Sequence, residues 1–147
     1  MNNVIQSKQK EHGQSMVELA LTITILMALL AGTIDLGRAF FTWLTMRDAA
    51  QEGASYGSIE PTDTGGIINR AELSFQDVII DADADVDINV SFSGPQCLGS
   101  TPSTITVQIE YNNFTLTMPF LGTILGSQTI PIRATVSDTI LMPLCTP

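Results

Sequence analysis

The feature that most constrains this chain is an apolar run near its N-terminus. From Leu19 to Ile34 there are 16 consecutive residues without a charge, and Glu18 is the only charged residue between Gly13 and Ile34. Counted from Gly13, the segment is 22 residues long. As an α-helix it would measure roughly 33 Å, which matches a hydrocarbon core of about 30 Å. The run therefore predicts a helix that crosses a membrane, with Glu18 neutralised or held at the interface.

A cleaved secretory signal peptide is the main alternative for this segment. Lys8 and Lys10 precede the apolar run as they would in a signal peptide. However, no Ala-x-Ala cleavage site follows the run, and the nearest triplet of small residues, at 37–39, has Arg38 at its centre. A retained membrane anchor is therefore favoured. Two basic residues flank each end, because Arg38 and Arg47 follow the run, so the basic residues alone do not set its orientation.

The helix is expected to continue beyond the membrane. No proline occurs between Ile34 and Pro61, which allows one helix from about Ser15 to Tyr56, roughly 63 Å long. Asp35 and Arg38 are spaced to form an exposed ion pair across one helical turn. The aromatic residues at 40, 41 and 43 fit either a membrane-interface belt or the first layer of a domain core.

Small residues recur at every fourth position of the same predicted helix, at Ala49, Gly53 and Gly57. Glycine costs about 1 kcal/mol inside a helix, so two glycines in register indicate that another element packs closely against this face. Gly57 could instead cap the C-terminus of the helix.

The second half of the chain predicts a small sheet. A linker at 58–66 precedes a short amphipathic helix at about 67–79, and the hydrophobic period then changes to two residues. Alternating segments at 80–92, 104–111 and 129–137 predict three strands, with Pro131 favouring an edge position for the last one. Residues 114–125 are expected to form a loop packed over the sheet. The fold class is therefore α+β, with one long N-terminal helix packed on a small antiparallel sheet.

Composition excludes several classes of function. The chain has six basic and 15 acidic residues, which gives a net charge of −9. A negative surface repels nucleic acid, so nucleic acid is disfavoured as a partner. The single histidine, His12, precedes the apolar run, and no nucleophile has a partner base in the sequence pattern. We therefore expect a protein that is not an enzyme and that needs no cofactor.

Two further groups of residues could form sites. Four aspartates alternate along the first predicted strand, and their mutual repulsion could be relieved by calcium. Because a straight strand presents its side chains in a row, a solvated strand face is favoured over a metal site. The two cysteines could form a disulfide in an oxidising compartment or remain free thiols. These residues are Asp81, Asp83, Asp85 and Asp87, and Cys97 and Cys145.

Three segments, in order, resemble the TadE-like family of minor pseudopilins from Tad-type (tight-adherence) pilus systems. They are Gly13-Gln-Ser-Met-Val-Glu-Leu-Ala-Leu, then Ile34-Asp-Leu-Gly-Arg-Ala-Phe-Phe-Thr-Trp, then Arg47-Asp-Ala-Ala-Gln-Glu-Gly-Ala-Ser-Tyr-Gly. The resemblance covers residues 13–58, about a third of the chain. It implies a pilin-like fold, with residues 1–13 as a leader, 14–58 as the membrane-spanning and extended helix, and 59–147 as an outer α+β domain.

The resemblance also implies how the chain would be used. A prepilin peptidase would cut between Gly13 and Gln14, and the new α-amine of Gln14 would lie one helical turn from Glu18, its charge partner in the same or a neighbouring subunit. The other partners would be Tad pilins, pseudopilins and the assembly machinery, in a bacterial or archaeal inner membrane, with the N-terminus cytoplasmic and the acidic domain outside. The alternative is an uncleaved, single-pass anchor whose outer domain binds an extracellular ligand.

Overall fold

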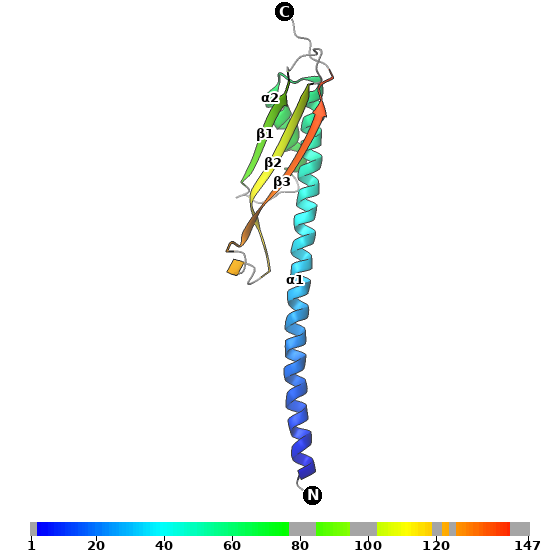
Figure 1. Cartoon of the computed structure of the whole chain (residues 1–147), viewed down its shortest axis with the longest axis vertical. Coiled ribbons are helices and arrows are strands. Elements are labelled where there is room, and N and C mark those ends of the chain that lie inside the picture. Colours follow the sequence, from blue (N-terminus) through cyan, green and yellow to red (C-terminus); the bar gives the residue numbers. More distant parts are fainter. Residues whose placement is uncertain (1–2, 77–84, 95–102, 119–121, 124–125, 142–147) are drawn as a thin grey trace, which may run out of the picture.

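The computed structural model describes residues 3–76, 85–94, 103–118, 122–123 and 126–141, and it describes side chains from Gly13 onward. One helix, α1 (Asn3–Ile59), runs the length of the molecule, and a small domain packs against its C-terminal half (Figure 1). The domain contains helix α2 (Thr64–Phe75) and strands β1 (Val86–Ser93), β2 (Thr104–Thr115) and β3 (Thr129–Thr139). This arrangement confirms the predicted α+β fold, a long N-terminal helix on a small antiparallel sheet.

Helix α1 is longer at both ends than the predicted 15–56. Its 57 residues correspond to about 85 Å of helix. Because the helix ends at Ile59, Gly57 lies inside it, and the interpretation of Gly57 as a C-cap is wrong. Within the apolar run, the hydroxyls of Thr22, Thr24 and Thr33 each donate to the backbone carbonyl four residues earlier, at 2.8 Å. These polar side chains are therefore satisfied without water.

The three strands form one antiparallel sheet in the order β1-β2-β3. The pairing places Ile88 opposite Ile109, and Val107 opposite Val136, so the apolar residues of all three strands share one face. Strand β3 lies at an edge, as Pro131 predicts. Strand β2 continues four residues beyond the predicted 104–111, with an irregularity between Tyr111 and Phe114. The first predicted strand began at residue 80, but residues 80–84 lie outside the described part of the chain.

Helix α2 begins three residues earlier than expected, inside the predicted linker. The carboxylate of Asp63 accepts a hydrogen bond from the backbone N–H of Gly66, at 2.9 Å, and so caps the helix at its N-terminus. The two glycines that follow Thr64 favoured a linker in the sequence pattern. The cap and the burial of Ile67, Ala71 and Phe75 outweigh the low helix propensity of those glycines.

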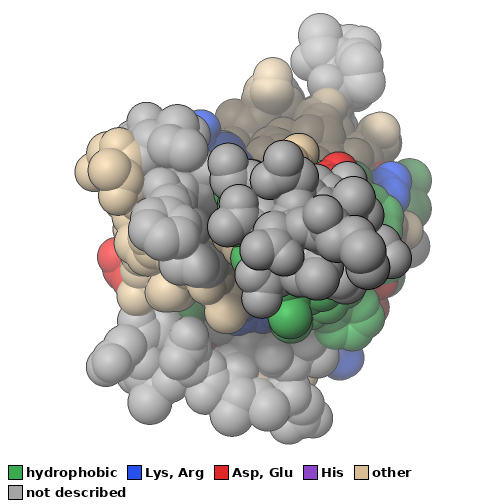
Figure 2. Space-filling view, turned by 90° about the horizontal axis from the view of Figure 1, so that it is seen from below, with side chains coloured by type: hydrophobic (Ala, Val, Ile, Leu, Met, Phe, Trp, Pro, Cys, Tyr) green, Lys and Arg blue, Asp and Glu red, His purple; other side chains and the backbone are tan. Residues whose placement is uncertain are grey.

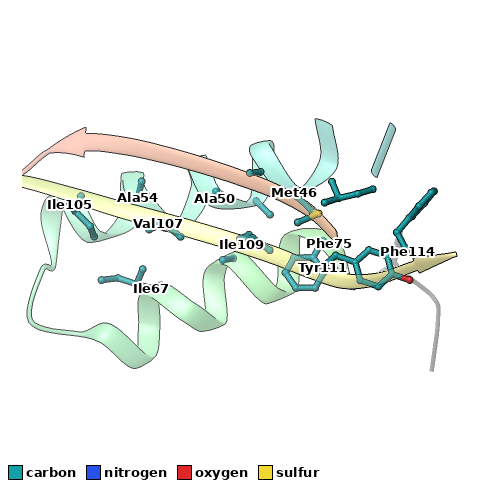
Figure 3. Close-up of a cluster of buried hydrophobic side chains, with 14 of the residues drawn as sticks. Met46, Ala50, Ala54, Ile67, Phe75, Ile105, Val107, Ile109, Tyr111 and Phe114 are labelled. Atoms are coloured by element: carbon teal, nitrogen blue, oxygen red, sulfur yellow. The ribbon is translucent and has the colours of Figure 1, made fainter. Parts of the chain in front are cut away.

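The hydrophobic core lies between α1, α2 and the inner face of the sheet (Figure 3). Met46, Ala50 and Ala54 supply the α1 side of the core, and β2 supplies the largest share of the opposite side. The small-residue stripe on α1 lies in this contact. A Cβ added at Gly53 would lie 3.2 Å from the carbonyl oxygen of Ile67, and one added at Gly57 would overlap the side chains of Ile67 and Ile105. The expectation of close packing along this face is therefore confirmed.

Of the loop predicted at 114–125, the first two residues belong to β2, and residues 119–121 and 124–125 lie outside the described part of the chain. Leu116 to Met118 run against α1 on the N-terminal side of the domain, where the backbone N–H of Met118 donates to Asp35 at 2.7 Å. Arg38 donates to the hydroxyl of Thr117, also at 2.7 Å, and its guanidinium lies over the ring of Phe114. Asp35 and Arg38 form the expected pair at 3.5 Å, but Asp35 is only 2% exposed because this connection covers it.

Candidate functional site

The proposed cleavage and charge-pairing residues lie on the free N-terminal part of α1. The helix passes without a break through Gly13, Gln14 and Glu18, and all three residues are exposed. A Cβ added at Gly13 would meet nothing within 4 Å, so packing within this chain does not require a glycine there. Gln14 and Glu18 are four residues apart, which places them on one helix face, separated by about 6 Å along the axis.

Glu18 has no charged partner within the described side chains, which begin at Gly13. An acid beside an apolar run is costly in a bilayer unless it is neutralised. An amine at Gln14 would supply one neutralising charge on the same helix face. The basic side chains at 8 and 10 lie outside the described side chains, so the structure does not place them relative to Glu18.

The surface around this part of α1 is strongly apolar. Between Met16 and Ile34 the large hydrophobic side chains are 48–72% exposed. Viewed from the N-terminal end, hydrophobic side chains gather on the right, where α1 lies (Figure 2). Within the described part of the chain, α1 is the one helix long and apolar enough to cross a membrane. The helix is therefore a single-pass membrane anchor by length and composition.

The aromatic residues that follow the apolar run do not belong to the domain core. Phe40 and Phe41 are about 60% exposed, and Trp43 is 37% exposed. Arg47 lies over the Trp43 ring, with its guanidinium carbon 5.9 Å from the ring centroid. Exposed aromatic side chains beside a cation are typical of the membrane interface, so the structure favours the aromatic-belt interpretation.

The aspartate series and the cysteines lie largely beyond the described residues. Asp81, Asp83, Cys97 and Cys145 are all outside them. Asp85 and Asp87 are described, and a carboxylate oxygen of Asp87 accepts a hydrogen bond from the side-chain amide of Asn112 at 3.0 Å. No group of metal-ligating side chains comes together in the part of the chain that the structure describes.

Two polar contacts were not identified from the sequence. One joins Met118 to the Asp35–Arg38 pair; the i,i+3 spacing predicted the pair, but no sequence pattern indicated its contact with Met118. The other joins Tyr56 to Asp63, with the phenol donating to the carboxylate at 2.9 Å and Arg70 lying over the ring. The N–H of Gly66 and then the Tyr56 phenol lower the pKa of Asp63, and the same phenol–carboxylate contact raises the pKa of Tyr56.

Comparison with known proteins gives one result. Residues 13–55 match the family model described as TadE-like protein. No curated protein and no solved structure matches the chain. The matched segment begins at Gly13 and ends inside α1, before the domain's sheet begins. The match confirms the resemblance seen in the sequence and indicates a protein related to Tad pili. Residues 13–55, all within α1, are therefore similar to the TadE-like family.

Proposed function

We propose that this protein is a minor pilin or pseudopilin of a Tad-type pilus, processed by a prepilin peptidase after Gly13. The observation that carries the proposal is the position of the family match, which begins at Gly13 and follows α1 as far as residue 55. The same helix presents an exposed glycine, then Glu18, then an exposed apolar surface. These three features, in this order, fit a chain that is cut after the glycine and then packs through its apolar surface against neighbouring subunits.

The chemistry assigned to the chain is simple. The peptidase hydrolyses the peptide bond between Gly13 and Gln14, which leaves a carboxylate on the leader and an α-amine on the mature chain. At neutral pH that amine is mostly protonated, because its ordinary pKa is about 8. It then pairs with Glu18 of the same helix or of a neighbouring subunit. The protein is the substrate of this reaction and performs no catalysis itself.

The remaining parts of the molecule take the roles of a membrane-anchored subunit. In this proposal α1 enters the inner membrane with its N-terminus on the cytoplasmic side. The apolar surface from Met16 to Ile34 packs against lipid before assembly and against other pilins afterwards. The sheet domain, whose outer face is rich in serine, threonine and asparagine, faces outward toward the assembly machinery or the surroundings.

The test is to determine the N-terminal residue and the intact mass of the protein from host membranes that contain a prepilin peptidase. A mature chain that begins at Gln14 supports the proposal. A chain that retains Met1 contradicts it and favours an uncleaved anchor carrying a binding domain. A chain that begins beyond Ile34 also contradicts it, because a signal peptidase would then have removed the anchor.

A further inference from the structure

The first residues after β2, Leu116–Met118, reach α1 on the N-terminal side of the domain core. After Leu116, which is buried, the chain continues to Met118, whose sulfur would lie 3.5 Å from a Cβ added at Gly32. The connection is held by side chains of the protein itself. The Gln128 amide donates to the carbonyls of Leu116 and Met118, at 2.7 and 3.2 Å. Asp35 accepts the Met118 N–H. The approach of Met118 to Gly32 is therefore fixed by hydrogen bonds within the protein.

The depth of this contact follows from helix geometry. A hydrocarbon core of about 30 Å holds about 20 residues of helix. With Glu18 held at the interface, one of the two arrangements open to it, the other boundary falls at about Arg38. The exposed belt of Phe40, Phe41 and Trp43 lies just beyond that point, where interfacial aromatics are expected. The span counted from Glu18 and the aromatic belt thus place the boundary near the same turn of α1. Tilt of the helix would only bring more of its residues into the hydrocarbon core.

Gly32 lies six residues before Arg38, or about 9 Å toward the bilayer centre. Met118, which packs against Gly32, lies at the same depth. The surrounding surface is apolar: an open cleft of about 400 Å³ runs along α1 from Ile25 to Leu36, with Met118 as its other wall. The cleft continues the lipid-facing surface of the anchor without a break. Its occupant in the unassembled protein is therefore a lipid acyl chain.

Asp35 provides a separate reason for Leu116–Met118 to lie at the depth of the hydrocarbon core. It falls about 4–5 Å inside the same boundary, where an uncovered carboxylate is costly. The connection buries it and supplies a backbone N–H, and the guanidinium of Arg38, about half exposed, supplies an opposite charge. From these observations we propose that Leu116–Met118 is immersed in the leaflet on the domain side and that acyl chains fill the cleft beside Met118. The proposal shares with the proposed function the insertion of α1, but it does not depend on cleavage after Gly13.

The native methionines allow a direct test on the full chain. Methionine labelled at its methyl group is incorporated, and the protein is placed in phosphatidylethanolamine–phosphatidylglycerol nanodiscs with one chain per disc. Methyl resonances are recorded with a nitroxide-bearing lipid in the disc, and separately with a gadolinium chelate in the water. The substitution Met118→Leu, which conserves side-chain volume, serves only to assign the Met118 resonance.

We expect the Met118 methyl to lose most of its intensity to the lipid nitroxide and to keep it with the aqueous chelate. Met27, which is exposed in the apolar run, should behave in the same way, whereas Met46, which is fully buried in the domain, should be less affected by the nitroxide. Broadening of Met118 by the chelate but not by the lipid would overturn the immersion. Protection from both probes would also overturn it, because the protein itself would then fill the cleft.

The controls separate this inference from the proposed function. If Met27 were not broadened by the lipid nitroxide, the anchor itself would be outside the bilayer, and both proposals would fail together. If Met27 were broadened and Met118 were not, the insertion of α1 would be supported, and only the proposed immersion of Leu116–Met118 would be contradicted. A Tad-type subunit processed at Gly13 remains compatible with that second result.

Discussion

At the scale of single residues, Gly13 has no packing role among the side chains that the structure describes. A side chain at position 13 would meet nothing within 4 Å, and the same is true at Gly37, farther along the same helix. The packing of the described residues therefore gives no reason for a glycine at position 13, whereas a peptidase that cuts there would.

The substitution Gly13→Leu is expected to block processing while the domain folds normally. The measurement is the intact mass of the protein from membranes that contain a prepilin peptidase. Gly37→Leu is the matched control, since it makes the same change at an equally open position, and it should be processed as the wild type is. A normal mature N-terminus in the Gly13→Leu protein would remove the assignment of the cleavage site.

Glu18 is expected to act after cleavage. Glu18→Ala should leave the mature N-terminus unchanged but lower the amount of protein incorporated into pili several-fold, because the amine of Gln14 would lose its partner beside the apolar surface. Sheared pili quantified against the membrane fraction give the measurement. Glu52→Ala, which removes an exposed acid from the same helix, is the control. Equal incorporation of wild type and Glu18→Ala would contradict this role.

At the scale of elements, the contact between α1 and the domain depends on the absence of side chains at Gly53 and Gly57. Ile67 of α2 contacts both positions, and Ile105 of β2 approaches Gly57. The i,i+4 spacing of the two glycines on α1 places both gaps on the face that α2 and β2 cover. The close approach of α2 to α1 therefore requires this stripe.

Gly57→Leu should destabilise the domain by about 1–3 kcal/mol, the usual cost of overpacking a filled core. The free energy of unfolding, measured by denaturant titration in detergent micelles, tests this. Gly37→Leu makes the same change on the same helix where space is open, and should leave stability unchanged or raise it by up to about 1 kcal/mol through helix propensity. Equal stabilities for the two variants would mean that the α1 contact is looser than described.

The N-cap of α2 predicts a pH dependence. The lowered pKa of Asp63 means that its charged form is favoured in the folded state. Its contribution to stability is therefore complete above the unfolded pKa of about 3.9 and is lost as the pH falls through the folded value.

Asp63→Asn keeps an acceptor for the cap but removes the titration. The difference in melting temperature between wild type and this variant should be largest above about pH 4 and should shrink at lower pH. Thermal unfolding in detergent across the acid range tests this. A difference that does not change with pH would contradict it.

At the scale of the whole molecule, the chain divides its apolar residues between two environments. The buried cluster and its partly buried neighbours begin at Ala39, whereas the hydrophobic residues between Met16 and Ile34 are exposed. Helix α1 carries the exposed set and also the first residues of the buried cluster, so a single element contributes both to the domain core and to an exposed apolar surface.

A fragment that begins at Ile34 should therefore fold in aqueous buffer without detergent. It keeps Asp35, Arg38 and the whole described core. Analytical ultracentrifugation and thermal unfolding would show a soluble species with a cooperative transition, whereas the full chain requires detergent or lipid. Aggregation of the fragment, or a gradual melt, would show that the core depends on the segment before Ile34.

The sequence by itself determined the features that depend on local spacing. The anchor follows from a run of apolar residues, the three strands from alternation with a period of two, and the edge position of β3 from Pro131. The close approach along Gly53 and Gly57 was also visible, because glycine in a helix interior has a cost that packing must offset. The Gly13 and Glu18 assignment rests on pattern and resemblance, and the structure adds only that both residues are exposed.

Only the tertiary structure decided what happens at the end of the apolar run. Asp35 was expected to form an exposed pair with Arg38, and residues 114–125 were expected to pack over the sheet. In the fold, the connection after β2 returns to α1 and buries Asp35 through the N–H of Met118, which is 83 positions away in the chain. No local pattern encodes such a contact, because it depends on the length and direction of β2 relative to α1. The fold thus makes the acid that follows the apolar run a contact point between α1 and the chain after β2.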